Sequence, residues 1–385
     1  MRTLRGLRAA WGLLCACALA SAALLPSASR SAAKAMPHGG GHGGNGYGLW
    51  AAQKPVSFKN LTIFPVRGRD AAGAGDYITL DEGIRAGTVV ITERGAGTMA
   101  RRPSRRGDRT QQVNMVAGDG ASVNQLALVN RSGKKLLLLS GEVIVGGKQD
   151  RIVQEDRVVP PVSVPIALDV FCVEHGRWQQ RASATGSMNS APVVAPASEP
   201  RKAENFYSLG AVAHPKLRAA SQDKKQQSEV WKEVGENNAR LGTANSTDTY
   251  QEVYSNKKIA GDMQEYIRAL EREVLQPGVV GVVVARNGEL VWADVFASSS
   301  LFARYWPKLL KSYAVDAIGD YRNDRVPNVL HAQRYLNERE GTVAAAGQAG
   351  VYQLVKIENP HYAVFELRDI SLRAPLRLHF NKMNR

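Results

Sequence analysis

The chain has 385 residues, of which 44% are hydrophobic and 22% are charged, so its length suits one large domain or two ordinary ones. These proportions are typical of a globular protein and exclude a chain that is disordered throughout. The formal net charge of +15 favours non-specific attraction to anionic surfaces. It does not indicate specific nucleic-acid binding, because the densest basic cluster, residues 101–109, holds proline and glycine but no aromatic residue on which bases could stack.

Residues 1–35 predict a secretory signal peptide. Three arginines precede an apolar run at residues 11–25, and A-x-A cleavage patterns occur at residues 20–22 and 33–35. The run is short for a membrane span, so we expect export to the periplasm or the cell exterior. Contact with a membrane would then require that this segment stay uncleaved. Its removal takes away five basic residues and no acidic one, which lowers the formal charge from +15 to +10.

Cysteine and histidine usage predicts neither a disulfide nor a metal site. Cys15 and Cys17 fall within the signal peptide, so the mature chain keeps only Cys172 and cannot form an internal bridge. Residues 36–50 are a glycine-rich linker whose His38 and His42 fit a solvated tether better than a metal site. No spacing of His, Cys, Asp and Glu fits zinc, and no glycine-rich dinucleotide motif follows a strand, so we expect no cofactor.

Residues 51–181 are predicted to be rich in β-strands. Runs of strand-forming residues bounded by Gly, Pro, Asn or Asp lie at 56–66, 77–84, 88–95, 122–145 and 162–178. One short patch, residues 80–86, is compatible with a helix. Residues 182–204 form a connection rich in Ser, Ala and Pro that we expect to be exposed.

Residues 205–372 add helices and hairpins. Helices are predicted at 221–242, at 247–274 with Ser246 or Thr247 as the cap, and at 298–318. Hairpins are predicted at 278–296, with Asn287-Gly288 as the turn, and at 351–369 around Asn359-Pro360. We therefore expect a single α+β domain over residues 51–372, with antiparallel strands and hairpins first and helices and further hairpins packed on them, followed by a tail at 373–385.

The segment "LSGEVIVGGKQDRIV", residues 139–153, resembles a phosphate-binding loop at first sight. The motif fails because Gly147 stands where its lysine belongs and Gln149 stands where its hydroxyl belongs. A hairpin with Gly146-Gly147 as the two-residue turn fits better, and its register would place Glu142 opposite Arg151. One face would then carry Glu142, Ile144, Gln149 and Arg151. This charge pair is either ordinary cross-strand stabilisation or part of a polar site.

The segment "VFCVEHGRW", residues 170–178, is the second block with chemical potential. Strand alternation places Cys172 and Glu174 on one face and His175 on the other, so His175 is poorly aimed to activate the thiol. We interpret Cys172 as a buried packing residue rather than a nucleophile. Trp178 is likewise expected in the core.

These blocks, together with "NLTIFPV", "YITLDEGI", "ITERG" and "LFARYWPKLLKSYAVDA", resemble one family of bacteria and archaea. It is the ADP-ribosylglycohydrolase (ARG) and rhodanese-phosphatase-superfamily-associated protein domain family. The resemblance covers about residues 53–369 and is most specific around residues 141–151 and 172–178. It implies a role near ADP-ribose and other NAD-derived metabolites, and it transfers no catalytic residues.

Two functions remain open from the sequence. The first is an exported domain that binds an anionic small molecule or a surface partner without chemistry. Its candidate ligand-binding residues are Lys148, Gln149, Arg151 and Arg177, because arginine holds phosphate or carboxylate by bidentate contacts. The second is a hydrolase-like enzyme acting on an ADP-ribose-type or phosphorylated metabolite, with Glu142 and Glu174 as candidate acid and base. A structural network of ion pairs would explain the same residues.

Overall fold

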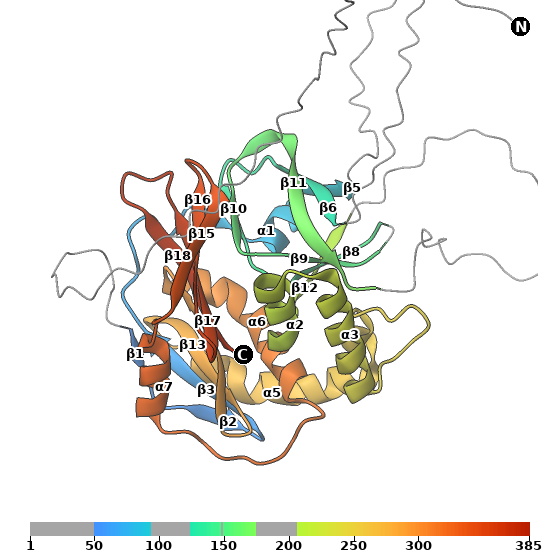
Figure 1. Ribbon diagram of the computed structural model, residues 1–385, viewed down its shortest axis with the longest axis vertical. Coiled ribbons are helices and arrows are strands. Elements are labelled where there is room, and N and C mark those ends of the chain that lie inside the picture. Colours follow the sequence, from blue (N-terminus) through green and yellow to red (C-terminus); the bar gives the residue numbers. More distant parts are fainter. Residues whose placement is uncertain (1–49, 94–123, 148, 175–205) are drawn as a thin grey trace, which may run out of the picture. The chain divides into compact units, whose positions relative to one another are not determined.

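The computed structural model describes residues 50–93, 124–147, 149–174 and 206–385. These belong to one unit that extends over Ala35–Arg385. The predicted signal peptide, the linker at 36–49, the basic cluster at 101–109 and the connection at 182–204 lie outside the described residues. The structure has an α+β fold, as the sequence predicts, with a β-rich first half that is followed by helices and hairpins (Figure 1).

The largest sheet has nine strands, and all of its pairings are antiparallel. Its order is β1-β3-β13-β14-β18-β17-β16-β15, and β2 pairs with β3 beside this path. The strands are β1 (Ala51–Ala52), β2 (Val56–Phe58), β3 (Leu61–Arg67), β13 (Val279–Arg286), β14 (Glu289–Phe296), β15 (Thr342–Gln348), β16 (Tyr352–Glu358), β17 (Tyr362–Asp369) and β18 (Leu376–Asn384). At one edge, every residue of β15 is exposed.

Two smaller sheets are built from strands that lie between Tyr77 and Val212. The six-stranded sheet has the order β12-β8-β9-β11-β6-β5, and the three-stranded sheet has the order β10-β7-β4. Their strands are β4 (Tyr77–Ile78), β5 (Val89–Glu93), β6 (Gln125–Asn130), β7 (Lys135–Leu138), β8 (Glu142–Val145), β9 (Arg151–Val153), β10 (Arg157–Val159), β11 (Val162–Cys172) and β12 (Tyr207–Val212). The pair of β4 and β7 is parallel.

Seven α-helices and one π-helical turn, at Ala220–Lys224, lie within the described residues. The helices are α1 (Leu80–Arg85), α2 (Pro215–Ala219), α3 (Gln227–Leu241), α4 (Glu252–Ser255), α5 (Lys257–Val274), α6 (Ser299–Ala317) and α7 (Val329–Asn337). None of the helices in the described part of the chain has the length and apolar character needed to cross a membrane.

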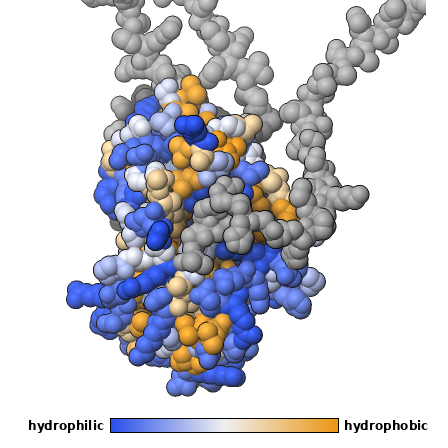
Figure 2. Space-filling view, turned by 90° about the vertical axis from the view of Figure 1, so that its left-hand side faces the viewer, coloured by the Kyte–Doolittle hydropathy of each residue, from blue (hydrophilic) through white to orange (hydrophobic). Residues whose placement is uncertain are grey.

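Strand alternation divides the core between the two faces of the nine-stranded sheet. On one face, side chains such as Ile63 and Val282 pack with α5 and α6. On the other face, Phe64 and Val283 pack with Ala332 and Leu336 of α7. Figure 1 shows α7 against the lower left part of this sheet, in orange-red. The side of the molecule drawn in Figure 2 is mostly hydrophilic, with separate small hydrophobic areas.

Local signals explain several helix starts. Thr79 and Glu82 form a reciprocal capping box that begins α1, close to the predicted patch at 80–86. Ser298 caps α6, the predicted helix at 298–318. The helix predicted to begin after Ser246 or Thr247 is divided into the short α4 and the longer α5. Helix α5 begins after Asn256, whose side chain accepts hydrogen bonds from two backbone amides.

Two predicted spans differ from the structure. The helix predicted at 221–242 is interrupted at Lys225, which has a φ of 53° and separates the π-helical turn from α3. Residues 373–385, expected as a tail, contain β18, which lies between β14 and β17. Phe380 and His379 of this strand are fully buried, so this segment is part of the core.

Candidate functional site: two buried charged groups

The hairpin of β8 and β9 exists, but its register differs from the predicted one. Ile144 pairs with Arg151 and Val143 with Ile152, a shift of two residues. Residues 146–150 therefore separate the strands, and Gly146 and Gly147 both have positive φ within this longer turn. Because the shift is even, Glu142 and Arg151 still share a face, but the same register places Glu142 opposite Val153.

The ionic partner of Glu142 comes from α6 rather than from β9. Lys308 Nζ lies 2.5 Å from Glu142 Oε1 and 2.6 Å from Asp81 Oδ2. Glu142 Oε2 also accepts the backbone N–H of Leu139 at 2.9 Å, and Asp81 accepts the hydroxyl of Ser208. The predicted pair of Glu142 with Arg151 across the hairpin is therefore wrong, because Glu142 is bound by an ammonium 166 positions away in the chain.

Burial and charge act in opposite directions on this Lys308 group. Glu142 and Lys308 are 1% and 3% exposed. Burial raises the pKa of Glu142, the charge of Lys308 opposes that rise, and the neighbouring Asp81 adds to it. Burial lowers the pKa of Lys308, but the two carboxylates outweigh it and the pKa is raised. The two carboxylates therefore favour the charged form of Lys308, whereas burial disfavours the charged form of Glu142.

The other predicted residues gather around Asp150, which sequence reasoning did not select. Glu174 Oε2 accepts the backbone N–H of Asp150 at 3.3 Å, and Gln149 Nε2 donates to the backbone oxygen of Glu174 at 3.0 Å. Arg151 Nη1 donates to the backbone oxygen of Asp150 at 3.4 Å, and Thr249 Oγ1 donates to Asp150 Oδ2 at 2.9 Å. The structure therefore brings Gln149, Arg151 and Glu174 into one group and places Glu142 in another.

The described candidate residues are buried. Gln149, Arg151 and Glu174 are between 1% and 3% exposed, and Asp150 is fully buried. Glu174 forms an isolated bridge with Thr249, which ties the end of the block at 170–174 to the segment before α4. Lys148 and Arg177 lie outside the described residues.

Cys172 is fully buried and forms no disulfide within the described residues, in agreement with its interpretation as a packing residue. The side-chain amide of Gln227 forms hydrogen bonds with both backbone groups of Cys172. Its oxygen accepts the N–H of Cys172 at 3.0 Å, and its nitrogen donates to the carbonyl of Cys172 at 2.8 Å. Burial raises the pKa of the thiol, and the nearby charge of Arg151 only partly opposes the rise. Such a thiol is poorly suited to nucleophilic attack. His175 and Trp178 lie outside the described residues.

A third charged network, which sequence reasoning missed, crosses the core. Asp294 of β14 receives two hydrogen bonds from Arg218, at 2.8 and 3.0 Å, and a third from Trp292 at 2.9 Å. His379 of β18 joins Asp294 to Asp156, with nitrogen–oxygen distances of 3.0 and 2.6 Å. The available signal was an aspartate within the apolar run "ELVWADVF", since a charge there requires buried partners.

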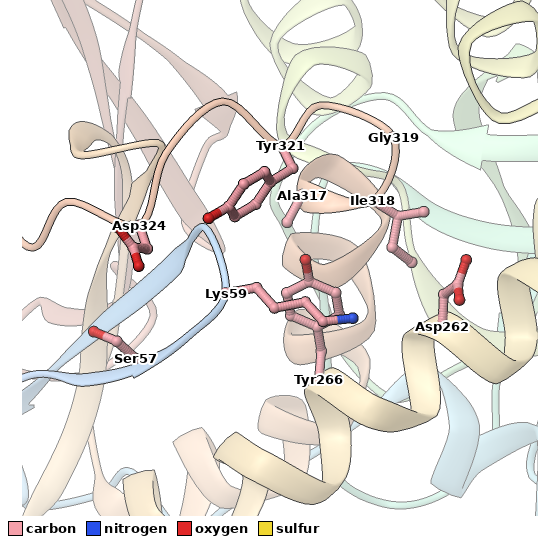
Figure 3. Close-up of a pocket in the computed structure, with 9 residues that line it drawn as sticks. All are labelled: Ser57, Lys59, Asp262, Tyr266, Ala317, Ile318, Gly319, Tyr321 and Asp324. Carbon is pink, nitrogen blue, oxygen red and sulfur yellow. The ribbon is translucent and has the colours of Figure 1, made fainter.

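An open pocket of about 780 Å³ lies away from these groups, at the C-terminal end of α6 (Figure 3). It is lined by Ser57, Lys59, Asp262, Tyr266, Ala317, Ile318, Gly319, Tyr321 and Asp324. None of the candidate site residues that the structure describes lines it.

A model of the ARG and Rhodanese-Phosphatase-superfamily-associated Protein domain matches residues 50–368. A search of curated proteins gives no significant match, and neither does a search of solved structures. The matched residues include both blocks that suggested the family, around Gly141 and Cys172. Because the match covers more than half of the chain, this protein belongs to the ARG and Rhodanese-Phosphatase-superfamily-associated Protein domain family.

Proposed function

We propose that this protein is an exported binding module that holds a small anionic molecule, or an anionic group on a surface partner, without chemical turnover. The observation that carries this proposal is the state of Glu142 and Glu174. Both carboxylates are 1% exposed and accept hydrogen bonds within the protein. A general acid or base must reach a substrate proton directly or through one water, which neither carboxylate can do without giving up these internal bonds.

Arg151 is the proposed anchor for the anion, and because its side chain is only 2% exposed, binding requires that its guanidinium become accessible. Its planar guanidinium suits phosphate or carboxylate, and Gln149 lies in the same group, bonded to Glu174. Lys148 and Arg177 are proposed as additional cations, since they are close in sequence to Gln149 and Glu174. The family description names an association with ARG, so ADP-ribose and phosphorylated metabolites are the first ligand classes to test.

Isothermal titration of the purified protein with ADP-ribose, AMP and inorganic phosphate tests this proposal. We expect saturable binding by at least one of these probes. Arg151→Ala should abolish it and Arg151→Lys should weaken it, because lysine keeps the charge but loses the bidentate contact. Arg131→Ala, which removes an exposed arginine, is the control and should bind normally. Equal binding by Arg151→Ala and Arg131→Ala, with both shown by circular dichroism to be folded, would refute the anchor.

The second candidate function is a hydrolase-like activity on an ADP-ribose-type or phosphorylated metabolite. The association in the family description favours it. It requires Glu142 or Glu174 to exchange its internal hydrogen bonds for contact with a substrate. Substitution of either carboxylate by the neutral amide would then abolish product formation while leaving ligand binding.

Export is proposed from the basic start and apolar run of residues 1–35. Mass spectrometry of the native protein should find an N-terminus between about residue 21 and about residue 40. An intact Met1 on protein from the cytoplasmic fraction would refute export.

A further inference from the structure

The two edges of the nine-stranded sheet differ. At one edge, the side-chain amide of Gln333 from α7 occupies backbone groups beside and within β1. Its oxygen accepts the N–H of Ala52 at 2.8 Å, and its nitrogen donates to the oxygen of Trp50 at 3.0 Å. Figure 1 shows α7 beside β1. The other edge is β15, whose outer side pairs with no strand in the described part of the chain. A side chain thus caps the sheet at β1, whereas no strand covers it at β15.

β15 is the longest edge strand of the three described sheets. It has seven residues, whereas the edge strands of the six-stranded sheet, β12 and β5, have six and five. β15 pairs with β16 over its whole length without a register shift. All seven residues are exposed, so neither face of the strand is covered. Every second residue of an antiparallel strand points its N–H and C=O away from its neighbour, so about half of these residues offer both groups to a partner.

β15 also lacks the features that usually protect an edge strand from pairing, which are charged side chains, prolines and bulges. Residues 341–350, "GTVAAAGQAG", contain no charged residue and no proline, and Val343 is 50% exposed. The edge strand β12 shows the contrast, because Lys311 of α6 donates to its Gly210 oxygen at 3.3 Å. The composition of β15 therefore leaves its edge suited to pairing with another strand.

A second copy of this chain fits this edge. Two identical antiparallel strands can be related by a two-fold axis that passes beside Ala345. The other six residues then form three pairs of uncharged side chains across the axis, so no like charges are opposed. These pairs are Thr342 with Gln348, Val343 with Gly347, and Ala344 with Ala346. The symmetry also places each outward N–H opposite a C=O of the other copy. Growth ends at two copies, because Gln333 caps the sheet at β1.

We propose that β15 forms the interface of a two-fold dimer, in which the β15 strands of two chains pair antiparallel and join their nine-stranded sheets. A strand of seven residues is about 23 Å long, so this contact lies at the low end of interface sizes and the dimer is reversible. The interface contains none of the residues proposed to hold an anion, so either proposal can fail without the other.

Sedimentation equilibrium of the purified protein, from micromolar to near-millimolar concentration, tests the proposal. We expect the mass to rise from that of a monomer to that of a dimer and no further. Ala345→Lys should raise the dissociation constant about two- to fivefold, because it sets two ammonium groups against each other at the axis. Ala345→Glu should act in the same way, and an equimolar mixture of the two variants should restore the dimer. Leu330→Lys places the same charge at a position of α7 that is 65% exposed, and this matched control should dimerise like the wild type.

Four results would overturn the proposal. The wild type could remain a monomer at every concentration. Ala345→Lys could dimerise as tightly as Leu330→Lys, which would place the interface elsewhere on the molecule. The mixture of the lysine and glutamate variants could dimerise no better than either variant alone. The mass could continue to rise beyond that of a dimer, which would show that the contact does not close on itself.

Discussion

Lys308 stabilises the charged forms of two carboxylates, those of Glu142 and Asp81. Its ammonium is 3% exposed and lies between Glu142, which is buried, and Asp81, which is 20% exposed. Removing a charge from a buried pair leaves its partner uncompensated, and this typically costs about 3–5 kcal/mol. The two carboxylates would also repel each other without Lys308. The group is therefore stable only as a complete set.

We expect Lys308→Met to lower the free energy of unfolding by about 3–5 kcal/mol. Glu142→Gln should cost less, because it also removes the desolvation of a buried charge. The double variant should be more stable than Lys308→Met alone, and urea denaturation of the four proteins gives the coupling free energy. Additive losses would show that Lys308 and Glu142 do not stabilise each other.

His379 is held in its charged form by the carboxylates on either side of it. Burial alone would lower its pKa, but the charge of Asp156 and hydrogen bonds to Asp156 and Asp294 raise the pKa to about 9. A histidine with a raised pKa stabilises the fold fully below its unfolded pKa near 6.5. That stability is lost as the pH rises through the folded value.

We therefore expect the free energy of unfolding to fall between about pH 6.5 and about pH 9, by on the order of 3 kcal/mol from this group. Urea denaturation across this range measures the slope. His379→Gln keeps a polar side chain without the titration and should flatten it. An unchanged slope in His379→Gln would mean that another group is responsible.

At the scale of elements, the β8–β9 hairpin depends on glycine at its turn. Gly147 has a φ of 56°, and a Cβ added there would lie 2.4 Å from the ring of Phe206. Gly133, in the turn between β6 and β7, has a φ of 74° but nothing within 4 Å of an added Cβ. The two glycines thus share backbone strain and differ in crowding.

We expect Gly133→Ala to cost about 1–2 kcal/mol, the usual penalty for a left-handed residue. Gly147→Ala should cost a further ~1–3 kcal/mol, because the buried Phe206 must move. Thermal unfolding of the two variants, compared at the same pH, measures the difference. Equal losses would show that Phe206 adapts freely and that the turn needs only the backbone freedom of glycine.

The sequence predicted those elements that carry their own signals. Asn287-Gly288 forms the turn of β13 and β14 with φ values of 52° and 82°, as expected for a type I′ hairpin. The N-cap at Ser298 and the capping box at Thr79 are local signals of the same kind, and they mark the starts of α6 and α1. β12 and β18 were missed because their conformations depend on tertiary contacts rather than local preference. Helix α7 was also missed, although Asn328 caps it by accepting the backbone N–H of Leu330.

At the scale of the molecule, membership of the family and the α+β class were predictable, but the grouping of the candidate residues was not. Glu142 meets Lys308 across 166 positions, and Asp150 meets Thr249 across 99. Such pairings follow from the topology of three sheets and not from spacing in the chain. The even shift in the hairpin kept the predicted face of Arg151 while changing its cross-strand partner to Ile144.

Binding without turnover is the central claim, and real-time NMR of ADP-ribose with the purified protein tests it most directly. We predict that the ligand signals broaden with the wild-type protein, that Arg151→Ala abolishes the broadening, and that no product signal appears during prolonged incubation. The claim would be contradicted by product signals that form with the wild type and disappear in Glu142→Gln or Glu174→Gln while those variants still bind ADP-ribose.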